Sequence, residues 1–258
     1  MGVQIPKRPP RRLAGRTRKG TVVRLRTDES KASASLVPAF VWGRTTRGIA
    51  VAVLCALAFA LWDTMVFLPV RLLVVTFHEL GHAVLAVLTG GEVLALGVGL
   101  DESGVTVTRG GNAFYVLNGG YLGSILVGLL LLVAGPSGKH ARLAAGVLGA
   151  VLAGVSVRHF SVDPVGFSVV LVSAVCLMGL ATRSPDWLAE LTVRTLGWFS
   201  LLYSMFDIRD DVFWSAGPNP RSDAAALEAM TGVAAPIWGV SWMGIGLVLL
   251  WLARRRLA

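Results

Sequence analysis

The chain has 258 residues, of which 54% are hydrophobic and 15% charged, and its formal net charge is +9. Together with a mean hydropathy of +0.68, this composition excludes an ordinary soluble domain and indicates a chain whose solvent is largely the lipid bilayer. About half of the 24 Lys and Arg residues precede the first apolar segment, so the rest of the chain is close to neutral.

Residues 1–47 form a basic N-terminal tail with Pro6, Pro9 and Pro10 and few large apolar side chains. Such a segment buries too little surface to offset its ordering entropy, so we expect it to be disordered. The positive-inside rule predicts that it is cytoplasmic, close to anionic lipid headgroups. No aromatic residues interleave its charges up to Lys31, and no nucleic-acid partner is expected.

Seven apolar runs follow, and they predict an all-α polytopic membrane protein with six or seven transmembrane helices. The run at 188–206 is the uncertain one, because Glu190 and Arg194 interrupt it. Arginines at the C-terminus favour a cytoplasmic end, which requires an even number of crossings and is satisfied by six. The runs lie at 49–69, 71–90, 116–135, 141–157, 164–181, 188–206 and 233–253.

Two connections between these runs are more than turns. Residues 92–115 hold two strand-like stretches, 93–96 and 104–108, which predict a short β-hairpin after the second apolar run. Residues 207–232 are the most polar stretch after the tail. We expect chemistry beyond the spans in these two loops.

The second apolar run contains His78-Glu79-Leu80-Gly81-His82, an H-E-x-x-H array. On a helix, His78 and His82 project from one face and can share one metal ion. Glu79 lies about 100° round the helix, which places it beside a metal-bound water and makes it a candidate general base. Three ionisable groups within five residues of a membrane span would be costly without such a function. The predicted cofactor is Zn²⁺.

A catalytic zinc usually takes three protein ligands, and no third ligand stands near the two histidines in sequence. The preferred candidate is Asp207, because it follows an apolar stretch and would sit at the membrane end of a helix. Asp223 is the alternative, and Asp63 in the first run is a third possibility or a residue that orients a ligand histidine.

These motifs resemble the site-2 protease (M50) family of intramembrane zinc metalloproteases, in its M50B-like bacterial branch. Beyond the H-E-x-x-H array, the likeness rests on Gly104-Val105-Thr106, Gly119-Gly120-Tyr121-Leu122-Gly123-Ser124, Ser204-Met205-Phe206-Asp207 and Ser222-Asp223-Ala224. The resemblance implies that residues 48–258 are a transmembrane metalloprotease-like domain in the cell membrane. It also implies that His78 and His82 are ligands, that Glu79 is the catalytic base and that an aspartate of a later helix is the third ligand.

The resulting hypothesis is hydrolysis of a peptide bond in a membrane-anchored protein substrate. The unpaired hairpin edge, with Gly104, Val105 and Thr106, is the candidate surface for an extended substrate segment. The alternatives are a non-catalytic membrane scaffold that binds membrane proteins and, less favoured, a metal transporter. Retention of Glu79 argues against the scaffold. The substrate, the pathway and the oligomeric state do not follow from the sequence.

Overall fold

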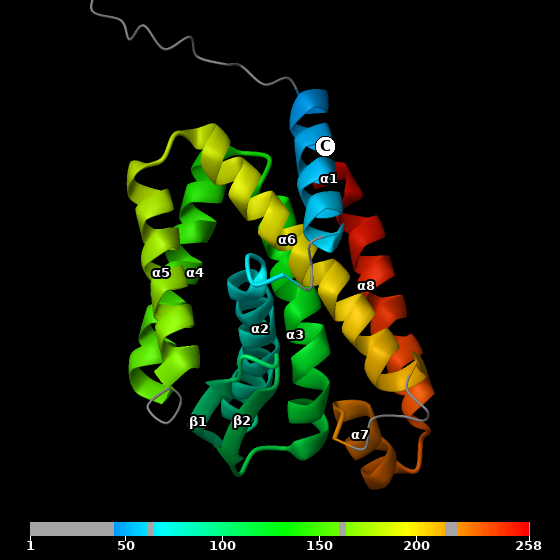
Figure 1. The fold of residues 1–258 in the computed structure, drawn as a ribbon. Helices are drawn as coiled ribbons and strands as arrows, with labels where there is room; N and C mark the ends of the chain where they lie inside the picture. The colour runs from blue at the N-terminus through cyan, green and yellow to red at the C-terminus, as the bar shows by residue number, and fades with distance from the viewer. Residues whose placement is uncertain (1–43, 61–63, 160–163, 215–220, 258) are drawn as a thin grey trace, which may run out of the picture. The chain divides into compact units, whose positions relative to one another are not determined.

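The computed structural model describes residues 44–60, 64–159, 164–214 and 221–257, which form long helices, one short helix and a two-stranded hairpin (Figure 1). The predicted basic tail falls almost wholly outside these residues, and so does Asp63. The helices are α1 (Arg44–Ala60), α2 (Leu68–Leu88), α3 (Ala113–Ala134), α4 (Gly138–His159), α5 (Pro164–Arg183), α6 (Asp186–Arg209), α7 (Asp223–Thr231) and α8 (Ala235–Leu257).

Five of the described helices, α2, α3, α4, α5 and α8, are long and apolar enough to cross a membrane. Many of their large apolar side chains are exposed, as suits contact with hydrocarbon. The other two predicted runs correspond to α1, with 17 residues, and to α6, which carries Glu190 and Arg194. The predicted all-α polytopic class is therefore confirmed, and the chain is a multi-pass membrane protein.

The helix boundaries follow local signals. α1 ends at Ala60 and α2 begins at Leu68, with Pro69 in its first turn, so the predicted run at 49–69 does not form one helix. Proline suits this position because the first helical N–H groups have no partner within the helix. The Asn112 side chain accepts a hydrogen bond from the Phe114 N–H and caps α3.

The predicted hairpin is confirmed. Strands β1 (Glu92–Val98) and β2 (Gly104–Arg109) pair antiparallel, from Glu92 opposite Arg109 to Val98 opposite Gly104. An irregularity between Val93 and Ala95 interrupts the register. The turn holds Glu102 at a φ of 65°, and the Glu102 carboxylate accepts a 2.6 Å hydrogen bond from Arg71 of α2. The hairpin is thus attached to the helix that carries the H-E-x-x-H array.

Glycines bring α2 and α3 into direct backbone contact. A Cβ on Gly81 would collide with the carbonyl oxygen of Gly119, and a Cβ on Gly123 would lie 2.7 Å from the Gly81 Cα. Small residues of this kind allow close helix packing where lipid supplies no hydrophobic driving force. α2 is the most buried of the five candidate spans, because 61% of its apolar stretch lies inside the protein.

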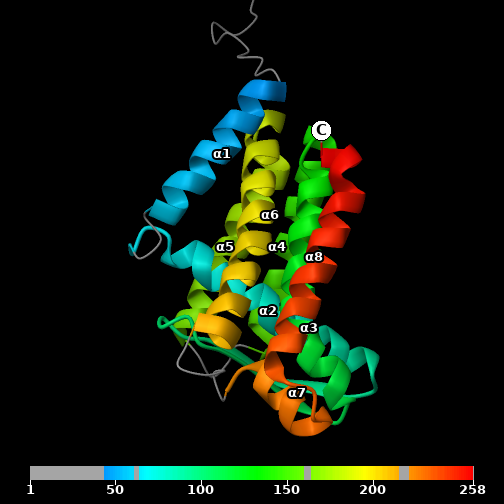
Figure 2. The ribbon, with the colours of Figure 1, turned by 90° about the vertical axis from the view of Figure 1, so that its right-hand side faces the viewer.

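The polar stretch at 207–232 is partly helical. α6 runs into a π-helical turn, η1 (Asp210–Trp214), and α7 follows after the residues that are not described. Ser222 caps α7 by accepting a hydrogen bond from the Ala225 N–H, and Gly232, at a φ of 74°, ends it. Figures 1 and 2 both place α7 beside the first part of α8 and near the start of α3.

Candidate metal centre

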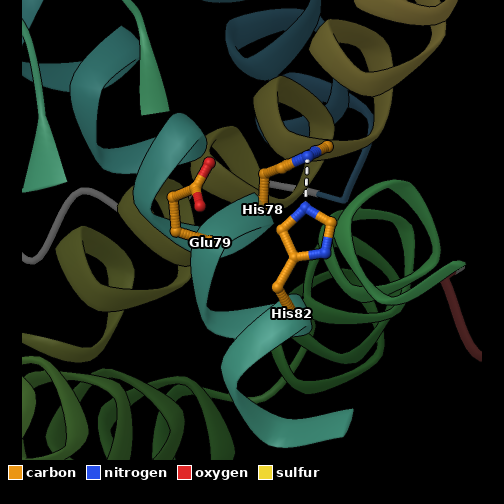
Figure 3. A group of neighbouring side chains, drawn as sticks. All are labelled: His78, Glu79 and His82. Carbon is orange, nitrogen blue, oxygen red and sulfur yellow. Dashed lines mark hydrogen bonds between the residues drawn. The ribbon is translucent and has the colours of Figure 1, made fainter. Parts of the chain in front are cut away.

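The two histidines of α2 face each other as their spacing predicts. Their Nε2 atoms lie 3.0 Å apart, and His78, Glu79 and His82 each offer one possible ligand atom within 4.8 Å of the other two (Figure 3). His82 Nδ1 is 2.7 Å from the Val116 carbonyl oxygen, which can only accept, so Nδ1 carries the proton. In the neutral form that a metal ligand requires, the lone pair of the His82 ring would be on Nε2, the atom that faces His78.

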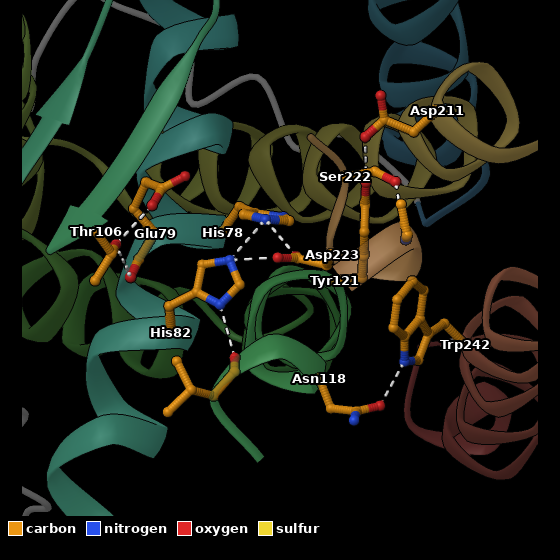
Figure 4. A network of polar contacts seen from close by, with 12 residues as sticks. His78, Glu79, His82, Thr106, Asn118, Tyr121, Asp211, Ser222, Asp223 and Trp242 are labelled. Carbon is orange, nitrogen blue, oxygen red and sulfur yellow. Dashed lines mark hydrogen bonds and ion pairs between the residues drawn. The ribbon is translucent and has the colours of Figure 1, made fainter. Parts of the chain in front are cut away.

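Asp223 of α7 reaches both histidines. Its Oδ2 atom is 3.1 Å from His78 Nε2 and 3.3 Å from His82 Nε2 (Figure 4). The same oxygen is buried and has no partner with hydrogen-bond geometry among the described residues. Burial would raise the pKa of this carboxyl, but the facing imidazoles outweigh burial and lower the pKa to about 2. The side chain is therefore an anion at neutral pH.

These three atoms suit a metal ion. Two imidazole nitrogens and a carboxylate oxygen are ligands that zinc takes in proteins. Around one tetrahedral zinc, such atoms lie roughly 3.3 Å apart, and here they are separated by 3.0, 3.1 and 3.3 Å. The buried oxygen of Asp223, without a hydrogen-bond donor, is the kind of atom that a cation would satisfy.

A glycine of α3 makes room for the imidazoles. A Cβ on Gly120 would collide with His78 Nε2 and would lie 2.7 Å from His82 Nε2. Tyr121, the next residue, packs edge-on against the His78 ring with centroids 4.7 Å apart. The Gly119-Gly120-Tyr121 sequence thus forms the wall behind the two histidines.

Glu79 is held by the hairpin. The Thr106 hydroxyl of β2 lies 2.5 Å from Glu79 Oε2 and 3.0 Å from the Glu79 carbonyl oxygen. Gly104 begins the same strand, and a Cβ there would collide with the Glu79 carboxylate. Glu79 itself is 5% exposed, which shields it from bulk water. The strand therefore lies directly against the candidate base.

A cavity of about 820 Å³ connects these groups. Its walls include the three residues of the H-E-x-x-H array, the first part of β2, the α6–η1 segment and the start of α7. The residues predicted to bind substrate line it, and so do both aspartate candidates: Gly104, Val105, Thr106, Asp207 and Asp223. An opening of this size beside a candidate metal centre suits an extended peptide segment.

The structure reverses the order of preference that the sequence gives to the two candidate aspartate ligands. Asp207, the preferred candidate, stands in the last turn of α6 and lines the cavity, but among the described residues it forms no ion pair with either histidine. Asp223, the alternative, contacts both. The physical reason is the packing of α7 against α3 and α8, which brings Asp223 to the histidines while Asp207 stays on the cavity wall.

Comparison with known proteins agrees with this geometry. The model of the family described as Peptidase M50B-like matches residues 50–253. The chain belongs to this family. Neither the curated proteins nor the solved structures contain a significant match. Proteases of the M50 family depend on zinc in general, and the His78, Glu79 and His82 group of this M50B-like chain has the composition and the spacing to hold a metal ion.

The sequence analysis did not predict two side-chain contacts that the structure shows at this site. Thr106 contacts the Glu79 carboxylate, and Tyr121 packs on His78. Both residues stand in sequence motifs that already point to the family, yet their partners lie 27 and 43 residues away, respectively. No local pattern gives such contacts.

Proposed function

We propose that this chain is an intramembrane zinc metalloprotease that hydrolyses peptide bonds of membrane-anchored proteins. The observation that carries the proposal is the convergence of His78 Nε2, His82 Nε2 and Asp223 Oδ2 on one point, with the Glu79 carboxylate beside it. Membership of the M50B-like family supports the same reaction class.

In this proposal His78, His82 and Asp223 hold the zinc, and Asp223 takes the place first given to Asp207. A zinc ion there would polarise a substrate carbonyl and lower the pKa of a bound water toward about 7. The anionic Asp223 offsets part of the metal's charge, while the Val116 carbonyl orients the His82 ring. Because the three side chains line the cavity, a water could reach a bound ion from there.

Glu79 acts as the general base. Its carboxylate accepts a proton from the attacking water and then gives it to the amine that leaves when the peptide bond breaks. The hydroxyl of Thr106 donates to Glu79 Oε2 and orients the carboxylate, so the second oxygen is left for the proton. Burial of Glu79 keeps the proton transfer away from bulk water.

The substrate is an extended segment paired with β2. Among the described residues β2 pairs with β1 alone, and its first part, Gly104 to Thr106, borders the cavity next to Glu79. A transmembrane helix hides its amides in its own hydrogen bonds, so a segment must unwind before it is cut. Main-chain bonds to an open strand edge compensate for the lost helical bonds.

We also propose that the N-terminus faces the cytoplasm. The start of α1 and the end of α8 lie at the same end of the helix bundle in both views (Figures 1 and 2). α8 ends in Arg254, Arg255 and Arg256, and Lys and Arg residues favour the cytoplasmic side. The bilayer is the surrounding solvent, and membrane proteins are the partners in this proposal.

The metal assignment is tested by zinc content per chain in detergent-purified protein. We expect about one zinc in the parent and in Asp207→Asn, and strong loss in His78→Ala and Asp223→Asn, because only the last two remove a proposed ligand. Asp207→Asn is the matched control, since it removes a carboxylate from the same cavity. Retention of zinc by Asp223→Asn with loss in Asp207→Asn would reverse the assignment.

Glu79→Gln separates a protease from a scaffold. The variant keeps the shape of the side chain but cannot accept the proton, so it should hold zinc as the parent does and cut nothing. The measurement compares membrane-protein fragments by mass spectrometry in cells that express the parent or Glu79→Gln. Identical fragment patterns would support the non-catalytic scaffold and exclude catalysis.

A further inference from the structure

Tyr121 of α3 lies between the two elements that supply the proposed ligands. Its side chain is 2% exposed. One edge of the ring meets His78, with centroids 4.7 Å apart, and the other side packs on Trp242 of α8 at 4.8 Å. The Trp242 indole N–H donates in turn to the Asn118 side chain, one turn before Tyr121 on α3. The ring is therefore fixed from both sides.

The hydroxyl of Tyr121 binds the segment that leads to α7. It donates a 2.6 Å hydrogen bond to Asp211 Oδ2, as Figure 4 shows. Asp211 belongs to η1, which follows α6 directly. Hydrogen bonds to a carboxylate are shorter and about twice as strong as those between neutral groups. The bond joins the wall behind the histidines to η1, the described segment that precedes α7 in the chain.

α7 depends on contacts of this kind for its place. It has nine residues, too few for a helix that is stable by itself. Its buried residues, Ala224 and Leu227, belong to one apolar cluster with Tyr121 and Trp242. Asp223 stands at the first position of this helix, so its distance to the histidines is set by how α7 packs on α3 and α8.

We propose that Tyr121 is a positioning residue of the metal centre. Its ring holds His78, and its hydroxyl, through Asp211, holds η1, whose Val212 packs in the same apolar cluster as Ala224 and Leu227 of α7. The inference rests on the proposed function in so far as the three side chains bind a metal. It adds a residue that is not itself one of the three ligands but fixes two of them relative to each other.

Tyr121→Phe isolates the hydroxyl, because it keeps the ring against His78 and Trp242. Zinc should leave Tyr121→Phe about tenfold faster than the parent when a chelator is added, as expected for the loss of one bond to a charged group. Tyr115→Phe is the matched control. It removes a hydroxyl from the same helix at a position that is 53% exposed, and it should behave as the parent does.

Changes at Asp211 test the partner. Asp211→Ala removes the acceptor together with the other interactions of this side chain, so it should accelerate zinc release at least as much as Tyr121→Phe, whereas Asp211→Asn keeps an acceptor oxygen and should restore most of the retention. The double variant Tyr121→Phe, Asp211→Ala should be no faster than Asp211→Ala alone, because that variant already lacks the bond to the Tyr121 hydroxyl. Additive effects would overturn the proposal.

Hydrogen exchange on metal-free protein gives a second readout. The amides of α7 should exchange about tenfold faster in Tyr121→Phe than in Tyr115→Phe, with the amides of α4 and α5 unchanged. Parental zinc release together with parental exchange in Tyr121→Phe would overturn the inference. A parent that binds no zinc would instead defeat the proposed function, and the exchange rates would still decide whether Tyr121 positions α7.

Discussion

Gly120 shows how little space separates the two imidazoles from the backbone of α3. A methyl group at this position would occupy the space of His78 Nε2 and crowd His82 Nε2. The need for glycine at Gly120 is steric and does not come from an unusual backbone angle, since the residue is helical. The close contact of glycine and imidazole leaves the lone pairs pointing at Asp223 rather than at the helix.

Gly120→Ala should therefore displace the histidines and lower zinc affinity at least tenfold. Alanine favours a helix over glycine by about 1 kcal/mol, so α3 itself should not weaken. Gly154→Ala is the control, because a Cβ there meets nothing within 4 Å. Zinc content and helical circular dichroism of both variants are the measurements. Parental zinc content in Gly120→Ala would contradict the steric account.

At the residue level, the sequence predicts what is local. His78 and His82 share a face because they are one turn apart, and the structure brings their nitrogens together. The sequence ranked Asp207 above Asp223 because Asp207 adjoins an apolar run. The contact of Asp223 with the histidines depends on how a nine-residue helix packs against α3 and α8, and no spacing in the chain encodes that.

The hairpin is the element whose attachment matters most to the candidate base. Two ion pairs tie it, and they differ in burial. The Arg71 and Glu102 side chains are 9% and 25% exposed, whereas those of Arg109 and Glu92 are 73% and 57% exposed. Only the first pair connects the hairpin to α2, since Glu92 and Arg109 both belong to the hairpin itself.

Glu102→Gln should loosen the hairpin and Glu92→Gln should not. Weakening a partly buried charged contact costs about 1–3 kcal/mol, while an exposed pair contributes about 0–1 kcal/mol. Hydrogen exchange of the β2 amides measures the difference, and fragment yield from membrane proteins should fall with the loosened strand. Equal exchange in the two variants would show that the Arg71 contact does not hold β2 in place.

Both hairpin strands and the long helices follow from hydrophobic patterning. The predicted stretches 93–96 and 104–108 fall within β1 and β2. Patterning fails at 207–232, where η1 and α7 replace a predicted polar loop, because short helices with few apolar residues give no periodic signal. Hydrophobic patterning also predicts one continuous run from α1 to the start of α2, because apolar residues follow Ala60 in the sequence.

For the whole molecule, the proposed orientation places both termini in the cytoplasm. Leu257→Cys, at the end of α8, and Ser30→Cys, in the N-terminal tail, test it in a background where Cys55 and Cys176 are replaced by serine. A membrane-impermeant maleimide should label both new cysteines in inverted vesicles and neither in intact cells. Labelling of either cysteine in intact cells would contradict the orientation of that terminus.

The distance along the chain between the proposed ligands also determines when the proposed metal centre can form. His78 and His82 emerge from the ribosome and enter the membrane long before Asp223 is synthesised. α7 then gains its packing only after α8 has supplied Trp242. In the proposed function, a nascent chain that still lacks α7 and α8 would carry the two histidines without the carboxylate of Asp223 and would not yet cut its neighbours.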